Sequence, residues 1–224
     1  MLIDALSGNL SFMEFIASAL SALMIIFLTL PIHEFAHGFV AARLGDPTPK
    51  FSGRLSLNPF AHIDYMGALA ILLFGFGWAK PVGVNPRYFK NPKAGMALTA
   101  FAGPVSNLIM AFLSYVIMNF VILLPLESVI VSFFFFFLYY FSLINVRLAV
   151  FNLIPIPPLD GFKVLSAVLP SRIYFRIMQY ERYIALGLLL LLYSGVLSTP
   201  INFAVYYVDY GVHWLASLPF RLFI

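Results

Sequence analysis

The sequence contains no cysteine. This absence excludes disulfide bonds and thiolate metal sites, so any bound metal must take His, Asp or Glu ligands. Charged residues are also scarce, at 10% of 224 residues, against about 25% in a typical soluble domain. Apolar residues make up 62% of the chain, and the mean hydropathy is +0.96. The composition predicts an integral membrane protein, and the length predicts a single domain over residues 1–224.

The placement of the basic residues predicts an orientation. The stretch MLIDALSGNL at the N-terminus lacks the basic region of a cleavable signal peptide. The net charge of +4 does not indicate nucleic-acid binding, because Lys and Arg in membrane proteins report which loops face the cytoplasm. Their distribution predicts a multi-pass protein with its N-terminus outside and two basic cytoplasmic regions. These regions hold Arg43, Lys50, Arg54, Lys80, Arg87, Lys90 and Lys93, and then Lys163, Arg172, Arg176 and Arg182.

Long apolar segments predict the helices, since a spanning helix needs about 20 mostly apolar residues. Residues 66–78 are too short to span and favour a re-entrant or interfacial piece. Residues 47–65 alternate polar and apolar positions and predict a strand or hairpin at the membrane face. The expected fold is a membrane, all-α bundle of about five to six transmembrane or re-entrant helices with small β elements. The longer segments are residues 11–32, continuing as a helix to Arg43, then 95–124, 128–151, 183–198 and 200–218.

A cluster of ionisable residues, HEFAH, ends the first apolar segment. His33 and His37 are four positions apart, so on a helix they share one face and can hold one zinc ion. Glu34 lies about 100° around the helix, where it can take a proton from water at the metal. A charge at the bilayer centre costs about 2.5–3.5 kcal/mol, so the cluster needs a compensating role. The alternative is a structural hydrogen-bond cluster near the membrane interface.

A catalytic zinc usually takes three protein ligands, and two histidines leave one missing. Asp160 is a carboxylate at membrane depth in the stretch FNLIPIPPLDGFKVL, whose prolines prevent a regular helix. Broken backbone at that depth is tolerated where it lines a cavity or is buried in protein. Asp160 is therefore a candidate third ligand. On spacing alone, the alternative that Asp160 only caps the helix over residues 161–169 is nearly as good.

Three motifs together resemble the site-2 proteases, intramembrane zinc metalloproteases of the M50 type. They are HEFAH, GPVSN at 103–107 and NLIPIPPLDG at 152–161, in the family's order. The resemblance implies that His33, His37 and Asp160 bind Zn2+ and that Glu34 is the general base. It also implies that Asn152 contacts substrate or the oxyanion, and that Asn107 helps to accommodate substrate.

The implied activity is hydrolysis of peptide bonds within or near transmembrane segments of membrane-protein substrates. The chain resembles the compact branch that lacks PDZ and CBS domains, which implies a bacterial or archaeal cytoplasmic membrane. The positions of the basic residues independently predict that the HEFAH segment, and with it the active site, lies toward the cytoplasm. Two rival functions use the same residues: a metal-ion transporter, with these side chains as a transit site, and a non-catalytic membrane scaffold. Clustering of the ligands at one place favours hydrolysis over transport.

Substrate contact and a second polar pair leave alternatives open. The strand-like pieces 51–57 and 80–85 are candidates for pairing with an unwound substrate, and a hairpin without substrate contact is an equal alternative. His62 and Asp64 are candidates for a gate or an additional ligand. A hydrogen-bond cluster at the membrane interface is the more common role for such a pair.

Overall fold

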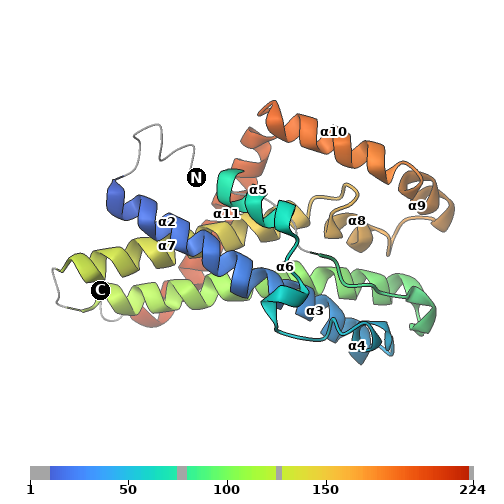
Figure 1. The fold of residues 1–224 in the computed structure, drawn as a ribbon, viewed down its shortest axis with the longest axis horizontal. Helices are drawn as coiled ribbons and strands as arrows, with labels where there is room; N and C mark the ends of the chain where they lie inside the picture. The colour runs from blue at the N-terminus through green and yellow to red at the C-terminus, as the bar shows by residue number, and fades with distance from the viewer. Residues whose placement is uncertain (1–10, 75–79, 125–127, 222–224) are drawn as a thin grey trace.

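The computed structural model describes residues 11–74, 80–124 and 128–221, and the regular elements within these ranges are all helices (Figure 1). Three helical stretches are long and apolar enough to cross a membrane. They are Phe12–Arg43, Pro92–Ile122 and Val129–Asn152, and in Figure 1 all three run along the long axis of the molecule. The protein is therefore an integral membrane protein with a helical fold, as the composition predicts.

The first spanning stretch consists of α2 (Phe12–Met24), a π-helical segment η1 (Ile25–Thr29) and α3 (Leu30–Arg43). It begins at a capping box, in which the Ser11 hydroxyl accepts the Glu14 N–H and the Glu14 carboxylate accepts the Ser11 N–H. It ends before Gly45, whose φ of 106° is open to glycine and rarely adopted by other residues. The predicted helix from residue 11 to Arg43 is confirmed.

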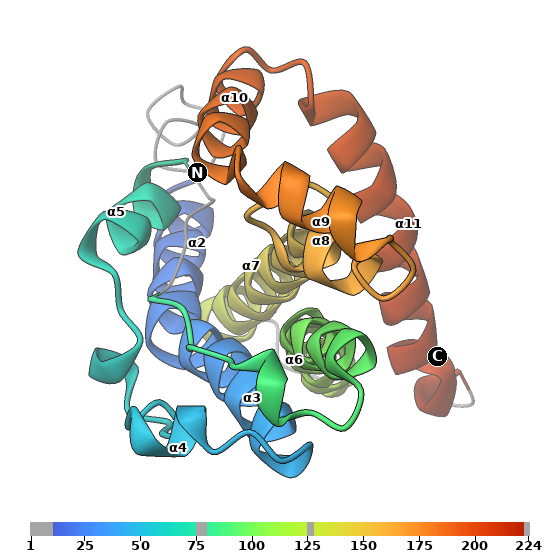
Figure 2. The ribbon, with the colours of Figure 1, turned by 90° about the vertical axis from the view of Figure 1, so that its right-hand side faces the viewer.

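The second and third spans are α6 (Pro92–Ile122) and α7 (Val129–Asn152). The Asn91 side chain caps α6 through the Ala94 N–H, and the Ser128 hydroxyl caps α7 through the Val131 N–H. Helix α6 packs against both α3 and α7, and α2 packs against α7. Figure 2, which looks along the long axis, shows α6 and α7 next to each other with α2 and α3 beside them.

The C-terminal helices α10 (Glu181–Tyr193) and α11 (Ser198–Ser217) occupy the last two predicted apolar segments. Their axes are bent by 85°, and Gly195 in the break has a φ of 76°. They count together as one broken span at most, so the described residues contain three spanning helices, or up to four. The hydroxyl of Tyr115 on α6 donates to Asp209 on α11 over 2.6 Å, which joins α11 to the bundle. The count of five to six helices stays a prediction.

The hairpin predicted over residues 47–65 is not confirmed, because this region contains two short helices and turns instead. They are α4 (Thr48–Phe51) and the 3-10 helix η2 (Pro59–Ala61). The Asp46 carboxylate accepts both the backbone N–H and the hydroxyl of Thr48, which starts a helical turn where the alternation suggested a strand. Local side-chain hydrogen bonds thus outweigh the two-residue periodicity.

Helix α5 (Tyr65–Phe74) occupies most of the short apolar segment 66–78, and residues 75–79 lie outside the described residues. Its length of ten residues is too short to span, as predicted. After it, residues 80–85 run without regular secondary structure to the 3-10 helix η3 (Pro86–Tyr88).

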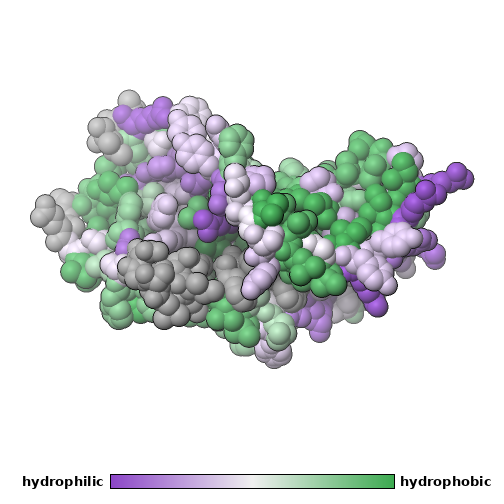
Figure 3. All heavy atoms as spheres, turned by 90° about the horizontal axis from the view of Figure 1, so that it is seen from above, coloured by the Kyte–Doolittle hydropathy of each residue, from purple (hydrophilic) through white to green (hydrophobic). Residues whose placement is uncertain are grey.

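Two further helices, α8 (Asp160–Leu165) and α9 (Ser171–Met178), follow the proline-rich stretch after α7. The rings of Phe162 on α8 and Tyr174 on α9 stack with their centroids 5.3 Å apart. Figure 3 shows hydrophobic side chains over much of the visible face, hydrophilic side chains at the end where α9 lies in Figure 1, and further hydrophilic side chains near the middle and the opposite end.

Candidate active site

The three ionisable residues of HEFAH lie on α3 at the wall of a cavity of about 630 Å³. The cavity is bounded by α3, α6, α8, α10, the end of α7 and the segment 80–85. His33, Glu34 and His37 are all buried, with exposed fractions of 5%, 8% and 7%. The mostly apolar cavity therefore contains a cluster of buried ionisable residues, three of which lie on α3.

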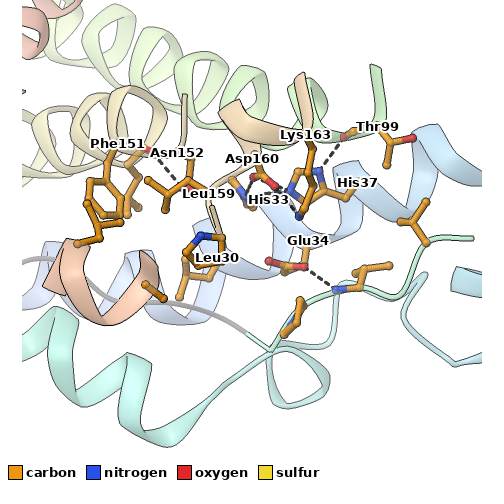
Figure 4. Close-up of a pocket in the computed structure, with 18 of the residues that line it drawn as sticks. Leu30, His33, Glu34, His37, Thr99, Phe151, Asn152, Leu159, Asp160 and Lys163 are labelled. Atoms are coloured by element: carbon orange, nitrogen blue, oxygen red, sulfur yellow. Dashed lines mark hydrogen bonds and ion pairs between the residues drawn. The ribbon is translucent and has the colours of Figure 1, made fainter. Parts of the chain in front are cut away.

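Asp160 comes from α8 to the same point as the two histidines, although it lies 127 positions from His33 (Figure 4). Its Oδ2 atom lies 3.3 Å from His33 Nε2 and 3.1 Å from His37 Nε2. The two Nε2 atoms are 3.0 Å apart. The structure thus brings together the three side chains that the sequence singles out as candidate metal ligands.

The opposite ring nitrogens show which atoms carry protons. His37 Nδ1 lies 2.7 Å from the Thr99 carbonyl oxygen, and His33 Nδ1 lies 3.3 Å from Asn107 Oδ1. Because a carbonyl oxygen only accepts, these contacts favour a proton on each Nδ1, and a neutral ring in that tautomer has its lone pair on Nε2. Such hydrogen bonds are the usual means by which a protein orients metal-binding imidazoles.

Three potential ligand atoms therefore meet at one point: two imidazole nitrogens and one carboxylate oxygen. With both rings neutral, a cation at their centre satisfies all three lone pairs. Tetrahedral zinc with bonds of about 2.0–2.2 Å places its ligand atoms about 3.3–3.6 Å apart. The observed separations of 3.0–3.3 Å are close to this value, so the donor set fits a zinc ion.

Two glycines allow this close approach of backbone and side chains. A Cβ atom at Gly103 on α6 would lie 2.5 Å from His37 Nε2 and 2.6 Å from His33 Cε1. A Cβ atom at Gly161 would collide with the carbonyl oxygens of Leu153 and Ile154. Gly103, the glycine of GPVSN, therefore forms the back wall of the histidine pair, and Gly161 allows α8 to start against the end of α7.

Glu34 lies beside the histidine pair, with potential ligand atoms of all three residues within 4.8 Å of one another. Its Oε2 accepts the backbone N–H of Val82 over 2.9 Å (Figure 4). Segment 80–85 is also held by the Asn85 N–H, which donates to Asp46 Oδ2, and by the Lys80 N–H, which donates to the His62 carbonyl. Segment 80–85, which the sequence analysis gives as strand-like, is therefore held beside Glu34 by hydrogen bonds from its own backbone N–H groups.

Lys163 is a site residue that the sequence analysis does not single out. Its Nζ lies 3.1 Å from Asp160 Oδ1, and its side chain lines the cavity. Burial alone would lower the pKa of Lys163, but the nearby carboxylates of Asp160 and Glu34 raise it above its usual value. The spacing of three between Asp160 and Lys163 on a helix is the sequence signal that could have identified this pair.

The two asparagines occupy different positions relative to the cavity. Asn152 lines the cavity, and its amide donates to the Leu148 carbonyl one turn earlier in α7. In Figure 4 it lies beside Phe151 and Leu159, apart from the histidine pair. Asn107 has no exposed surface and lies behind His33 rather than among the residues that line the cavity.

His62 and Asp64 take local roles outside the cavity lining. His62 is fully buried, and its Nε2 lies 2.7 Å from the Ser56 carbonyl oxygen. Asp64 accepts the N–H groups of Met66 and Gly67 at the start of α5. These contacts correspond to the hydrogen-bond cluster that the sequence analysis gives as the more common alternative.

Comparison with known proteins yields a family and several relatives. A model described as peptidase family M50 matches residues 122–193. "Putative zinc metalloprotease YwhC" of Bacillus subtilis is 41% identical over 155 residues, which cover 68% of this chain and 70% of YwhC. "Putative zinc metalloprotease Rip2" of Mycobacterium tuberculosis is 28% identical over 200 residues, covering 87% of this chain and 73% of Rip2.

"Zinc metalloprotease MJ0392" of Methanocaldococcus jannaschii is 28% identical over 181 residues, which cover 80% of this chain and 43% of MJ0392. No solved structure matches the chain significantly. The identity and coverage shared with YwhC show that the chain belongs to peptidase family M50. The resemblance drawn from the three motifs is thereby confirmed.

Proposed function

We propose that this membrane protein is a site-2-type zinc metalloprotease that hydrolyses peptide bonds within or near transmembrane segments of its substrates. The observation that carries the proposal is the convergence of three potential ligand atoms from His33, His37 and Asp160, with Glu34 beside them. Membership of peptidase family M50 and relatives named zinc metalloproteases support the same chemistry. The whole chain, 1–224, acts as one domain.

Each site residue has a separate task in this proposal. His33, His37 and Asp160 hold Zn2+, which when bound polarises a carbonyl and lowers the pKa of water toward about 7. Glu34 takes a proton from the attacking water and delivers it to the leaving amine. Its Oε2 is held by the Val82 N–H, which keeps the carboxylate directed into the cavity. Asn152 lies on the cavity wall, where one N–H of its amide donates to the Leu148 carbonyl and the second can donate to the developing oxyanion.

The apolar cavity wall fits a substrate from the membrane. A transmembrane helix hides its amide groups in its own hydrogen bonds, so it must unwind before hydrolysis. Segment 80–85 lines the cavity with Pro81, Val82 and Val84 and is the candidate partner for an unwound strand. Because the Val82 N–H is bound to Glu34, a substrate strand pairs through other backbone groups of the segment. Residues 51–57 do not line the cavity: Phe51 ends α4, and residues 52–57 follow it without regular secondary structure.

The basic residues orient the molecule in a cytoplasmic membrane, which we propose to be prokaryotic. Arg43 at the end of α3 and the exposed arginines of α9 lie on the cytoplasmic side. The N-terminus then lies outside, and the active site lies toward the cytoplasm. Asn107 acts through His33 rather than by touching the substrate, because it is fully buried behind that ring.

The Glu34→Gln substitution tests the proposed function. The assay uses a single-span fusion protein with an Asn-Pro pair in its transmembrane segment, reconstituted with the protease in liposomes. We expect kcat to fall by at least about 100-fold, because general base catalysis contributes about 10²–10⁴-fold. Zinc content should stay unchanged, since Glu34 is not among the three converging ligands. The Glu181→Gln variant, altered at the start of α10 outside the cavity lining, is the matched control and should cleave normally.

Three outcomes contradict the proposal. Wild-type cleavage by the Glu34→Gln variant would exclude Glu34 as the base. Cleavage that persists after zinc is removed with a chelator would exclude a metalloprotease. Zinc flux into the liposomes without proteolysis would favour the transporter alternative.

A further inference from the structure

Asp160 uses its two carboxylate oxygens for two different partners (Figure 4). The Oδ2 atom faces the Nε2 atoms of His33 and His37, at 3.3 and 3.1 Å. The Oδ1 atom faces the Nζ of Lys163, at 3.1 Å. The two oxygens of the Asp160 carboxylate therefore face different groups. The histidines on α3 lie at Oδ2, and Lys163 on α8 lies at Oδ1.

Lys163 differs from an ordinary surface ion-pair partner. The Asp160 side chain is only 8% exposed, and the Lys163 side chain is 38% exposed and lines the cavity. Exposed ion pairs are weak because water screens them, whereas a hydrogen bond to a buried charged group is stronger. The pair lies beside a second buried carboxylate, Glu34, so the ammonium also offsets the negative charge that collects in the cavity.

A freely rotating carboxylate could turn either oxygen, or both together, toward the histidine pair. The hydrogen bond from Lys163 occupies Oδ1 and leaves only Oδ2 for the centre. We propose that Lys163 is a positioning residue that restricts Asp160 to presenting one oxygen at the metal site. The inference rests on the proposed function, because it assigns Lys163 a task in holding a ligand of the same site.

The alternative task for Lys163 is direct contact with substrate through the cavity. The two tasks predict different measurements. A substrate-binding lysine affects KM and leaves the metal environment unchanged. A positioning lysine affects kcat and changes the metal environment even without substrate. Because cobalt(II) absorbs visible light according to its coordination number and ligands, cobalt-substituted protein reports that environment directly.

The experiment compares the Lys163→Met variant with wild-type protein in detergent and in liposomes. Methionine keeps much of the length of the side chain and removes its charge. We expect kcat to fall by about 10–100-fold, the usual effect of losing a partner that orients a metal ligand, with KM changed less than about twofold. The cobalt(II) absorption bands should change in position and intensity. The Lys90→Met variant, altered at an exposed lysine before α6, is the control for loss of a positive charge.

Chemical rescue excludes an effect of misfolding. Because the sequence has no cysteine, the Lys163→Cys variant carries a single thiol. Alkylation with 2-bromoethylamine converts it to S-aminoethylcysteine, which restores an ammonium at nearly the length of lysine, and mass spectrometry verifies the conversion. We expect the alkylated protein to regain the wild-type cobalt spectrum and most of kcat, and the unmodified variant to behave like Lys163→Met.

The possible results separate the two proposals. If wild-type protein neither binds cobalt or zinc nor cleaves the fusion substrate, the proposed function itself is wrong. If the wild type binds metal and cleaves, but Lys163→Met has an unchanged cobalt spectrum, the positioning role alone is overturned. This holds whether the activity of the variant is normal or changed only in KM. Failure of alkylation to restore the spectrum would also overturn it.

Discussion

The Gly103→Ala substitution is expected to disrupt the metal site without touching a ligand. The added Cβ would lie 2.5 Å from His37 Cε1 and Nε2 and 2.6 Å from His33 Cε1. Ordinary contact begins at 3.4 Å, so the rings and α6 must separate by about 0.9 Å. Gly103 lies between Thr99 and Asn107 on α6, and these two residues hold the Nδ1 atoms of the same histidines. Helix α6 therefore cannot retreat without stretching both hydrogen bonds.

This displacement is large for a metal centre, whose ligand distances tolerate about ±0.2 Å. We expect zinc affinity to fall by at least about 100-fold, at the upper end of effects seen when orienting partners are lost. Alanine normally stabilises a helix interior relative to glycine by about 0.5–1 kcal/mol. Overpacking here costs about 1–3 kcal/mol, so the variant should also be less stable toward thermal unfolding.

Competition between the purified protein and a chromophoric chelator measures zinc affinity, and thermal denaturation in detergent measures stability. Gly211→Ala is the matched control, because a Cβ at this glycine of α11 meets nothing within 4 Å. The control should bind zinc normally and be equally or more stable. Wild-type zinc affinity in the Gly103→Ala variant would refute the view that α6 forms the back wall of the histidine pair.

Two further substitutions test the surroundings of the site. Asn107→Ala removes the acceptor for His33 Nδ1 and should weaken zinc binding by about 10–100-fold in the same competition assay; an unchanged affinity would mean that packing alone orients His33. Asp46→Ala leaves the N–H groups of Thr48 and Asn85 without their acceptor, at a cost of about 1–3 kcal/mol each if they stay buried. Hydrogen exchange should then accelerate in segment 80–85 while zinc affinity stays normal, and slow exchange there would show that Asp46 does not hold the segment.

The spanning helices could be predicted because their signals are local. Long apolar runs leave the backbone of α6 and α7 no partner in lipid except its own helix. The hairpin over residues 47–65 could not be excluded, because its alternating pattern is equally a local signal. The competing interaction, between Asp46 and the backbone and hydroxyl of Thr48, becomes visible only in the folded chain. Similarly, the bend of 85° between α10 and α11 depends on Gly195 and on packing, and two apolar runs do not reveal it.

The sequence by itself determined the pair His33 and His37, because the four-residue spacing on a helix places both rings on one face. It also made Asp160 a candidate, since a proline-broken segment at membrane depth must line a cavity or be buried. Only the tertiary structure decided that Asp160 Oδ2 meets both Nε2 atoms and that Lys163 holds the other oxygen. These contacts join residues from separate helices, and such distances depend on how α3, α6 and α8 pack rather than on any local pattern.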